Sequence, residues 1–432
     1  MKNKIVAVLL TAALAAAMLA GCSGGSDSSV SDGSKTEDGE AAKETGDEKN
    51  ADTSGGRTEV TLWHALTDEE VDLVQSYVDD FNEQSEIAEV TLVYTPTDEM
   101  IKQLTIGNIA GDMADMVLMD NCYTSEFAAS GVLEELTGYY NDWDENQFLD
   151  GPLQSVTYND GIYGIPYASN CLALFYNEDM LTEAGVEVPA TWDELKTAAA
   201  ALTTDEHTGF ALCGAKDGEG TFQIYPLIAS AGGDINHLDS EGSVEAVQLI
   251  GDMIAEGSVS KEIMNWSQAD LEKQFASGNI AMMINGVWQV EPLRSDAPDL
   301  NWNVAYIPVP EGGTYATTLG GENLCVTAGA ETDACWEFIS WLCGKEISPK
   351  FCKDMSRFSG RSDVNNEEWF DDEVTLFFAN YMQYTVARVH PRWTECASAL
   401  QVAYQKVYSG EESAADAMAE AQVEIDAINA EE

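Results

Sequence analysis

The sequence predicts an α/β protein of two lobes, each a mainly parallel sheet flanked by helices, with a hinge between the lobes. Length is the first reason, because residues 58–432 exceed what one hydrophobic core usually accommodates. Strand and helix signals also alternate along this stretch, and β-α-β order favours parallel strands with helices on both faces. With 45% hydrophobic residues, 10 Trp and 16 Tyr, the chain can fill two cores.

The first strands and helix of the predicted fold follow one another closely. Residues 60–63 form a short β-rich run, and Thr67-Asp68-Glu69-Glu70 is a capping box that opens a helix with regularly spaced apolar positions. Residues 90–94 and 116–119 give two more strands. This order predicts a β-α-β unit at the start of the first lobe.

Helix signals mark the later part of the chain. A second capping box spans residues 191–194, and helices are expected at 270–277 and 333–343, each followed by a glycine. The C-terminal segment starts with Ser413 and places apolar residues on one face of a further helix. No repeat of solenoid length is visible.

The N-terminus predicts an exported, membrane-anchored protein. Lys2 and Lys4 precede an apolar run at 5–20 that is too short for a membrane span of about 20 residues. The sequence Leu19-Ala20-Gly21-Cys22 resembles the bacterial lipobox, which implies a signal peptide at 1–21 and a diacylglyceryl group on Cys22. Two acyl chains suffice for stable anchoring. The alternative is an ordinary signal peptide with a chance cysteine.

Residues 22–57 are expected to form a disordered linker behind the lipid. Residues 23–57 contain no aromatic residue and one large aliphatic residue, Val30, so burial cannot offset the cost of ordering the backbone. A coil of this length would reach roughly 30 Å. We therefore expect the protein on the outer face of the cytoplasmic membrane, in an envelope of Gram-positive type.

The formal net charge of −56 excludes several partners. Nucleic acids and anionic lipid headgroups are bound by Lys and Arg clusters, which are not seen here. A highly soluble acidic surface is the plainer interpretation. The nine cysteines form no CxxC pair, and apart from Cys22 we expect most of them to be buried free thiols.

Motifs of catalysis that a sequence can reveal are missing. There is no GxSxG, HExxH, SxxK or P-loop motif, and the four histidines are dispersed. No cofactor and no metal are predicted. A pair of carboxylates at glycosidase spacing is a three-dimensional feature, so a lipid-anchored glycosidase remains an alternative.

Six fragments in a fixed order resemble the extracellular solute-binding proteins of ABC importers, in the group that includes maltose-binding and glycerol-phosphate-binding proteins. The resemblance covers Thr58 to the C-terminus. The fragments are residues 160–167 (DGIYGIPY), 174–177 (LFYN), 184–194 (AGVEVPATWDE), 275–282 (FASGNIAM), 285–288 (NGVW) and 319–321 (LGG).

The resemblance implies a periplasmic-binding-protein-like fold of the class II type, whose two lobes close on a ligand like a hinged clamp. It divides the chain discontinuously, with one lobe at 58–165 plus 311–350 and the other at 166–310 plus 351–432. Gly164 and Pro166 bracket a segment suited to a hinge, although a surface turn would use the same residues.

The implied function is capture of a sugar or oligosaccharide and its delivery to ABC permease subunits by a monomeric receptor. The run Leu62-Trp63-His64 resembles glycerol-phosphate-binding relatives, so glycerol phosphate is an alternative ligand within the same role.

Candidate ligand-binding residues follow the predicted strands, since ligands of open parallel sheets bind beyond the carboxyl ends of strands. The first strand is followed by Trp63 and His64, and the strand at 116–119 by Asp120, Asn121 and Tyr123. Asp120 could accept paired hydrogen bonds from sugar hydroxyls or cap the next helix. Trp63 could stack on a ligand or belong to the core.

The resemblance adds further candidates. Trp288 matches the aromatic platform of the family and Trp266 is a weaker platform candidate, while Gly321 would let backbone approach the ligand. The remaining candidates lie near the hinge, next to Gly321 or among the scarce arginines, and they are Tyr167, Asn170, Glu322, Asn323, Arg361, Arg392 and Trp393. The arginines could equally be partners of acidic side chains.

Overall fold

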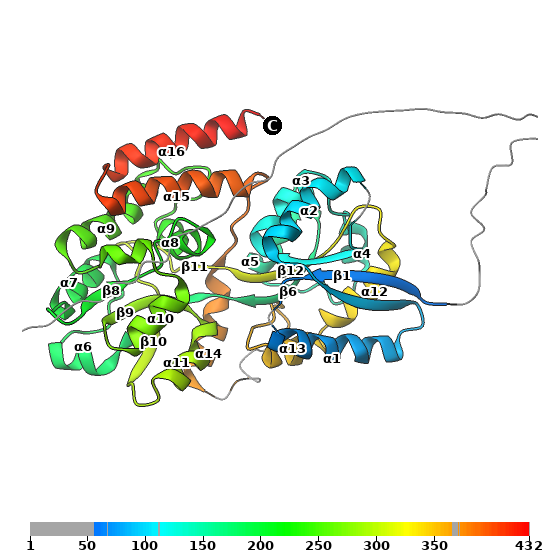
Figure 1. The fold of residues 1–432 in the computed structure, drawn as a ribbon, viewed down its shortest axis with the longest axis horizontal. Helices are drawn as coiled ribbons and strands as arrows, with labels where there is room; N and C mark the ends of the chain where they lie inside the picture. The colour runs from blue at the N-terminus through cyan, green and yellow to red at the C-terminus, as the bar shows by residue number, and fades with distance from the viewer. Residues whose placement is uncertain (1–55, 67, 111–112, 365–369, 371, 432) are drawn as a thin grey trace, which may run out of the picture. The chain divides into compact units, whose positions relative to one another are not determined.

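Two β-sheets, each covered by helices, organise the chain (Figure 1). The computed structural model describes residues 56–431 except 67, 111–112, 365–369 and 371. The predicted signal peptide, Cys22, nearly all of the predicted linker and the first residue of the Thr67–Glu70 capping box lie outside these residues.

The first lobe is built on a five-stranded sheet in the order β2-β1-β3-β12-β6. Strands β2 and β3 run parallel to β1, whereas β12 is antiparallel to both β3 and β6. The strands are β1 (Thr58–His64), β2 (Ala88–Tyr94), β3 (Met116–Asp120), β6 (Ile165–Asn170) and β12 (Gly320–Val326). The chain therefore returns from far along the sequence to place β12 between β3 and β6.

Helices and short elements complete the first lobe. The helices are α1 (Asp68–Gln84), α2 (Thr97–Ala110), α3 (Thr124–Ala129), α4 (Thr137–Asp142), α5 (Asp150–Ser155), α12 (Thr332–Leu342) and α13 (Ser348–Asp354), with the 3-10 turn η1 (Asn121–Tyr123) and the hairpin β4 (Thr157–Tyr158) and β5 (Gly161–Ile162). Strand β3 is buried on both faces, because Met116 and Leu118 pack into one core while Val117 and Met119 pack into another.

The second lobe is built on a four-stranded sheet in the order β10-β7-β9-β8. Strand β7 is antiparallel to β10 and β9, and β8 is parallel to β9. The strands are β7 (Leu172–Asn177), β8 (Thr208–Ala211), β9 (Ile280–Gly286) and β10 (Trp302–Ala305). Every residue of β9 is buried, as expected for a central strand covered by helices on both faces.

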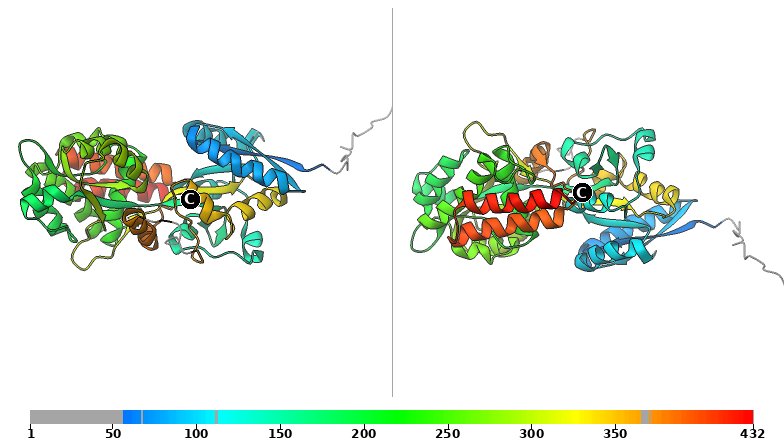
Figure 2. Two further views of the ribbon diagram at one scale, coloured as in Figure 1. Left: turned by 90° about the horizontal axis from the view of Figure 1, so that it is seen from below. Right: turned by 90° about the horizontal axis from the view of Figure 1, so that it is seen from above.

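The helices of the second lobe share one large core with its sheet. They are α6 (Glu178–Ala184), α7 (Trp192–Leu202), α8 (Gly218–Ser230), α9 (Glu241–Glu256), α10 (Gln268–Ala276), α11 (Val290–Asp296), α14 (Glu373–Tyr381), α15 (Trp393–Ser409) and α16 (Ala414–Asn429), with the 3-10 turns η2 (Lys261–Met264), η3 (Val287–Gln289) and η5 (Met382–Tyr384). Helices α15 and α16 lie side by side (Figure 2).

The chain passes between the lobes at strand ends. Strand β6 ends at Asn170 in the first sheet, and β7 begins at Leu172 in the second, so the crossing falls on Cys171. Leu319 likewise separates β12 from β11 (Thr317–Thr318), which pairs with β13 (Thr385–Val386). The predicted hinge at 164–167 is misplaced, because Ile165 and Pro166 already pair with β12.

The predicted α/β architecture of two lobes is confirmed, with one correction. The sheets are mixed rather than mainly parallel, because β12 enters the first sheet from the second lobe and β7 runs against both of its neighbours. The predicted helices are present with shifts of up to two residues at their starts. For example, Ser267 and Asp270 form a capping box that starts α10 at Gln268.

Two other expectations can be compared with the structure. The eight described cysteines are free and buried, as predicted. None of the described helices has the length and apolar character needed to cross a membrane.

Candidate functional site

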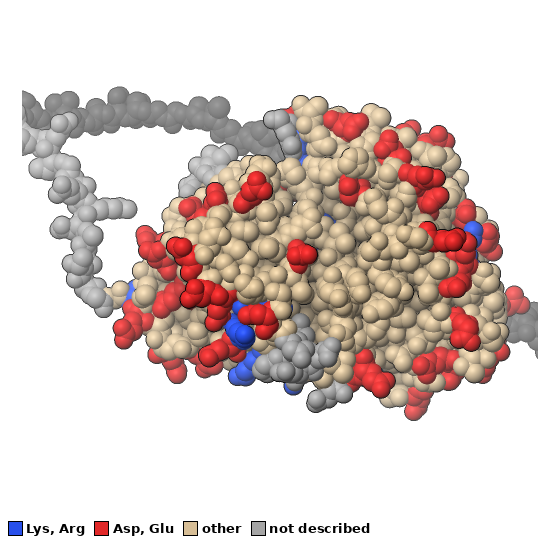
Figure 3. Space-filling model, turned by 180° about the vertical axis from the view of Figure 1, so that it is seen from behind, with Lys and Arg blue, Asp and Glu red and all other residues tan. Residues whose placement is uncertain are grey.

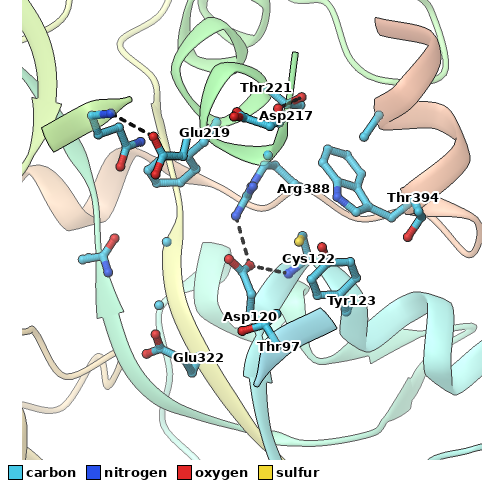
Figure 4. A pocket seen from close by; sticks show the side chains of 18 of the residues that line it. Thr97, Asp120, Cys122, Tyr123, Asp217, Glu219, Thr221, Glu322, Arg388 and Thr394 are labelled. Atoms are coloured by element: carbon cyan, nitrogen blue, oxygen red, sulfur yellow. Dashed lines mark hydrogen bonds and ion pairs between the residues drawn. The ribbon is translucent and has the colours of Figure 1, made fainter. Parts of the chain in front are cut away.

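A cavity of about 1000 Å³ lies where residues of both lobes meet. One wall comes from β3, η1, β6 and β12 of the first lobe, and the other from α8, α10, η3 and α15 of the second. In Figure 4, Asp120 and Glu322 lie on one side of the pocket and Asp217, Glu219 and Thr221 on the opposite side. The volume suits a small-molecule ligand.

Asp120 ends β3 and serves both the backbone and the cavity. Its Oδ1 accepts a hydrogen bond from the backbone N–H of Cys122 at 3.1 Å, which caps η1. The same oxygen accepts a bond from Nη2 of Arg388 at 3.1 Å, across the cavity (Figure 4). The cap and the cavity role were alternatives in the sequence, and the structure combines them.

Arg388 follows β13 and reaches the cavity from the second lobe. It is 4% exposed, and its guanidinium lies over the rings of Phe222 at 4.6 Å and Trp393 at 5.8 Å from their centroids. Burial alone would lower the pKa of Arg388, but Cys122, Asp120 and other ionisable neighbours raise it. The arginine is therefore a fixed cation, held by aromatic faces on one side and by Asp120 on the other.

Glu322 lies on β12 directly opposite Asp120 in the strand register. Loss of solvent raises its pKa to about 7; Arg357 opposes this rise, and Asp120 and Glu70 add to it. Arg357 is itself engaged in an ion pair with Glu70, with Nη2 to Oε1 at 3.3 Å. The carboxyl group of Glu322 thus faces the cavity without a dedicated cation.

Aromatic rings dominate the second wall. The rings of Phe222 on α8 and Trp288 on η3 are 5.9 Å apart and inclined by 36°, and Trp393 starts α15 beside them. The indole of Trp288 packs against the backbone at Gly286, because a Cβ atom on Gly286 would collide with the ring. The half-buried Trp288 ring offers an apolar face to a ligand in the cavity.

A second contact ties the lobes together at the edge of this cavity. Oε2 of Glu126, on α3, accepts hydrogen bonds from the backbone N–H and the hydroxyl of Thr394, on α15, both at 2.9 Å. Together with the Asp120–Arg388 pair, this contact holds α15 and the segment before it against the first lobe.

Seven of the residues predicted from the sequence line the cavity. They are Asp120, Tyr123, Asn170, Trp288, Gly321, Glu322 and Trp393. Burial raises the pKa of the Tyr123 phenol, so Tyr123 acts as a neutral hydrogen-bonding group. Gly321 has φ of +100°, and a side chain at this position would collide with the backbone of Ala168.

Four predicted residues on β1, η1 and β6 of the first lobe lie outside the cavity lining. Trp63 packs against a separate core, and the Nδ1 of the buried His64 accepts a bond from the backbone N–H of Leu66 at 3.3 Å. Asn121 donates from Nδ2 to the Leu319 carbonyl at 3.4 Å, and Tyr167 is buried against Phe351. Their side chains serve the fold instead.

The other four are also engaged elsewhere. Trp266 packs on the core of the second lobe, and Asn323 donates to the hydroxyls of Thr124 and Ser155 at 2.9 and 3.1 Å. Arg361 is buried and bound to Asp363, while Arg392 pairs with Glu395 and Glu431. The arginines are thus partners of acidic side chains, the alternative that the sequence left open.

Other lining residues were missed at the sequence level. Arg357, Arg388, Phe222 and Gln401 also line the cavity, and no sequence signal singles them out. One signal was available, because Asp217-Gly218-Glu219-Gly220 is a glycine-rich stretch shortly after a strand, where α8 begins. No comparable sequence signal distinguishes the residues of α8 and α15 that line the cavity from the rest of these helices.

The charged side chains of the cavity indicate which ligands it can bind. Its lining contains four carboxylates, at Asp120, Asp217, Glu219 and Glu322, and two arginines. Acidic side chains also spread over the face of the molecule in Figure 3, with few basic ones between them. Within the described residues, no group of three or more His, Cys, Asp and Glu side chains could hold a metal ion.

The sequence of this chain matches a known protein family and several known proteins. A family model described as bacterial extracellular solute-binding protein matches residues 76–378. A binding protein of Brucella abortus (strain 2308) is 29% identical over 77% of this chain and 84% of its own length. A maltotriose-binding protein of Pyrococcus abyssi (strain GE5 / Orsay) is 22% identical over 76% of this chain and 72% of its own length.

Solved structures share the fold. The cyclic α-maltosyl-1,6-maltose binding protein of Arthrobacter globiformis superimposes with a TM-score of 0.76 at 23% identity. The match covers 86% of this chain and 99% of that structure. The likeness therefore extends over both lobes.

Proposed function

Because this chain belongs to the family of bacterial extracellular solute-binding proteins, we propose that it captures a sugar or oligosaccharide between its lobes and delivers it to a membrane ABC permease. The cavity carries the proposal, because an aromatic wall faces a wall of hydrogen-bonding groups. The family binds solutes without transforming them, so the glycosidase alternative is set aside.

A sugar suits the chemistry of both walls. The apolar face of a sugar ring can stack on Trp288, while its hydroxyls donate hydrogen bonds to Asp120 and Glu322. The relative from Pyrococcus abyssi is a maltotriose-binding protein, which supports a carbohydrate as the solute class. The lining residues that we propose as ligand contacts are Asp120, Tyr123, Asn170, Trp288, Gly321, Glu322 and Trp393.

Glycerol phosphate is the weaker alternative. A phosphate needs uncommitted cations or backbone donors, yet Arg388 is paired with Asp120 and Arg357 with Glu70. The four carboxylates of the lining would repel a phosphate. The charge of the cavity thus favours a ligand without negative charge.

We further propose a lipid anchor at Cys22, a flexible linker behind it and a monomeric receptor on the outer face of the membrane. The lipobox-like sequence supports the anchor. The predicted lobes, 58–165 plus 311–350 and 166–310 plus 351–432, would shift their boundaries to the crossings at Cys171 and Leu319, and they would close on the ligand as a clamp. Cys171 and Leu319, where the chain changes sheet, are the expected pivots.

A thermal-shift screen of the purified full chain over mono- and oligosaccharides and glycerol phosphates tests the proposal. A sugar at about 100 times its dissociation constant should stabilise the protein by about 2.7 kcal/mol. A glycerol phosphate that stabilises the chain when no sugar does would overturn the carbohydrate assignment.

Solution scattering with a verified ligand tests the clamp. Closure is a population shift towards the state that the ligand bridges, so the radius of gyration should fall on binding. A tight ligand that leaves the scattering profile unchanged would contradict closure, while solute binding itself would stand.

A further inference from the structure

We propose that the cavity contains a subsite for a protonated amine at Asp120, Glu322 and Asn170, so that the preferred sugar carries an amino group. This inference rests on the proposed sugar-binding function and narrows its ligand class. The three side chains come from three adjacent strands, β3, β12 and β6, and all of them line the cavity.

Strand register brings the two carboxylates together. Glu322 on β12 is the direct partner of Asp120 on β3, and like charges directly opposite each other destabilise a sheet. Arg388 bonds Asp120 through Oδ1, the atom that also caps η1, and among the described residues it forms its ion pair with Asp120 rather than with Glu322. Oδ2 of Asp120 remains available to a ligand.

Glu322 has no cation of its own among the described residues. The charged groups that act on it are Arg357, Asp120 and Glu70, and Arg357 is engaged by Glu70. A carboxylate that loses solvent without gaining a cation is costly, and a ligand ammonium would supply that cation. The raised pKa of Glu322, about 7, is consistent with this environment.

Asn170 gives an independent sign of a missing partner. It is 6% exposed and lines the cavity, and its Oδ1 has no hydrogen-bond partner among the described residues. Gly320 is its direct partner in the register, two residues from Glu322, so the amide and the carboxylate are diagonal neighbours. A side chain at position 320 would collide with the Asn170 amide and close the space.

An ammonium matches this arrangement better than the other candidates. It brings one positive charge and three donors, for Asp120 Oδ2, Glu322 and the Asn170 amide oxygen. A neutral hydroxyl brings one donor and leaves the charge of Glu322 uncompensated, and an anion would be repelled. A metal ion is disfavoured because the described residues contain no cluster of ligands for one.

Calorimetry on the purified full chain at pH 7 tests the subsite with matched pairs of sugars. The pairs are glucose with glucosamine, galactose with galactosamine, mannose with mannosamine, and cellotriose with the β-1,4-linked trisaccharide of glucosamine. Each pair differs in hydroxyl against ammonium at carbon 2. We expect at least one amino sugar to bind about tenfold tighter than its hydroxyl twin, equal to about 1.4 kcal/mol.

Glu322→Gln should remove this preference, because the amide retains an acceptor but carries no charge to attract an ammonium. Glu187→Gln is the matched control, since Glu187 is exposed and lies outside the cavity lining, and it should keep the preference. Thermal unfolding of each variant verifies that it is folded, and Asp120→Asn provides a second variant with the same expected loss.

The outcomes separate this inference from the function on which it rests. Hydroxyl sugars that bind as tightly as their amino twins, or a Glu322→Gln variant that keeps the preference, overturn the amine subsite alone. A screen in which no sugar of either kind binds overturns both the subsite and the carbohydrate proposal.

Discussion

The two walls of the cavity differ in their chemistry and in the elements that build them. The first-lobe wall presents carboxylates at Asp120 and Glu322, set by the register of β3 and β12. The second-lobe wall presents Phe222, Trp288 and Trp393, set on two helices and a 3-10 turn. The first-lobe wall is thus suited to accept hydrogen bonds from hydroxyl or amino groups, and the second-lobe wall to stack on the apolar face of a ring.

The first-lobe wall therefore contributes charge and hydrogen bonds, and the second-lobe wall contributes an apolar surface for stacking. Strands fix the distance between neighbouring side chains, so the ends of adjacent strands suit groups whose hydrogen bonds demand precise spacing. Helix faces present broad surfaces, which suit stacking. Arg388 joins the walls, since it lies on the aromatic rings and bonds Asp120.

The largest expected effect comes from an arginine outside both walls. Arg361 is 1% exposed and donates to Asp363 at 2.8 and 3.1 Å and to the Cys343 carbonyl at 3.0 Å. Arg361→Met should lower the free energy of unfolding by about 3 kcal/mol, because it leaves these acceptors unsatisfied. Ligand affinity, measured by calorimetry well below the unfolding transition, should be unchanged.

Arg294→Met is the control for Arg361. Arg294 pairs with Glu291 and Asp372 and is partly exposed, so its loss should cost less than about 1 kcal/mol. If Arg361→Met instead abolished binding and left unfolding unchanged, the sequence-level assignment of Arg361 to the ligand would be restored.

The aromatic wall gives the next largest effect. Trp288→Ala should weaken sugar binding by about 1 to 3 kcal/mol, by analogy with the stacking of bases on aromatic side chains. Trp63→Ala is the matched control, because Trp63 packs on a core of the first lobe and lies outside the cavity lining. Calorimetric titration of both variants with the same sugar distinguishes them. Equal losses would mean that the aromatic wall is not the stacking surface.

Much of the fold could be predicted because strand and helix signals depend on local sequence. The rule that ligands bind beyond strand ends points to Asp120 and Tyr123, and both line the cavity because β3 ends there. The same rule failed for Trp63 and His64. Strand β12 returns from residues 320–326 to lie between β3 and β6, so the cavity forms at the ends of β3, β12 and β6, on the side of β3 away from β1.

The rest of the site depends on partners that are distant in sequence. Nothing near Arg388 marks it as the arginine of the cavity, because its partner Asp120 is 268 residues away. From the sequence, Arg361 and Arg392 were equally good candidates for the cavity. In the structure each of them forms an ion pair with an acidic residue close to it in sequence. Phe222 is hidden in a helix whose residues are mostly buried, where an aromatic residue carries no sign of its role.

The smallest expected effect tests whether the carboxylate wall is electrostatically strained while the aromatic wall is not. The pKa of Glu322 is about 7 in the folded chain against an ordinary value of 4.5, so the folded state holds this proton more tightly. The resulting stabilisation is complete below pH 4.5 and is lost as the pH rises through 7. Glu322→Gln should therefore be more stable than the parent chain at pH 8, by about 1 to 2 kcal/mol after allowance for solvent screening.

At pH 4.5 the same variant should differ much less from the parent chain, because Glu322 is then protonated in the folded state and already half protonated in the unfolded state. Thermal unfolding at the two pH values measures the difference, and subtraction cancels the other titrating groups that both chains share. Glu187→Gln should show no such dependence, because Glu187 is exposed. A gain at pH 8 that persisted unchanged at pH 4.5 would come from packing rather than charge, and the two walls would then differ in shape alone.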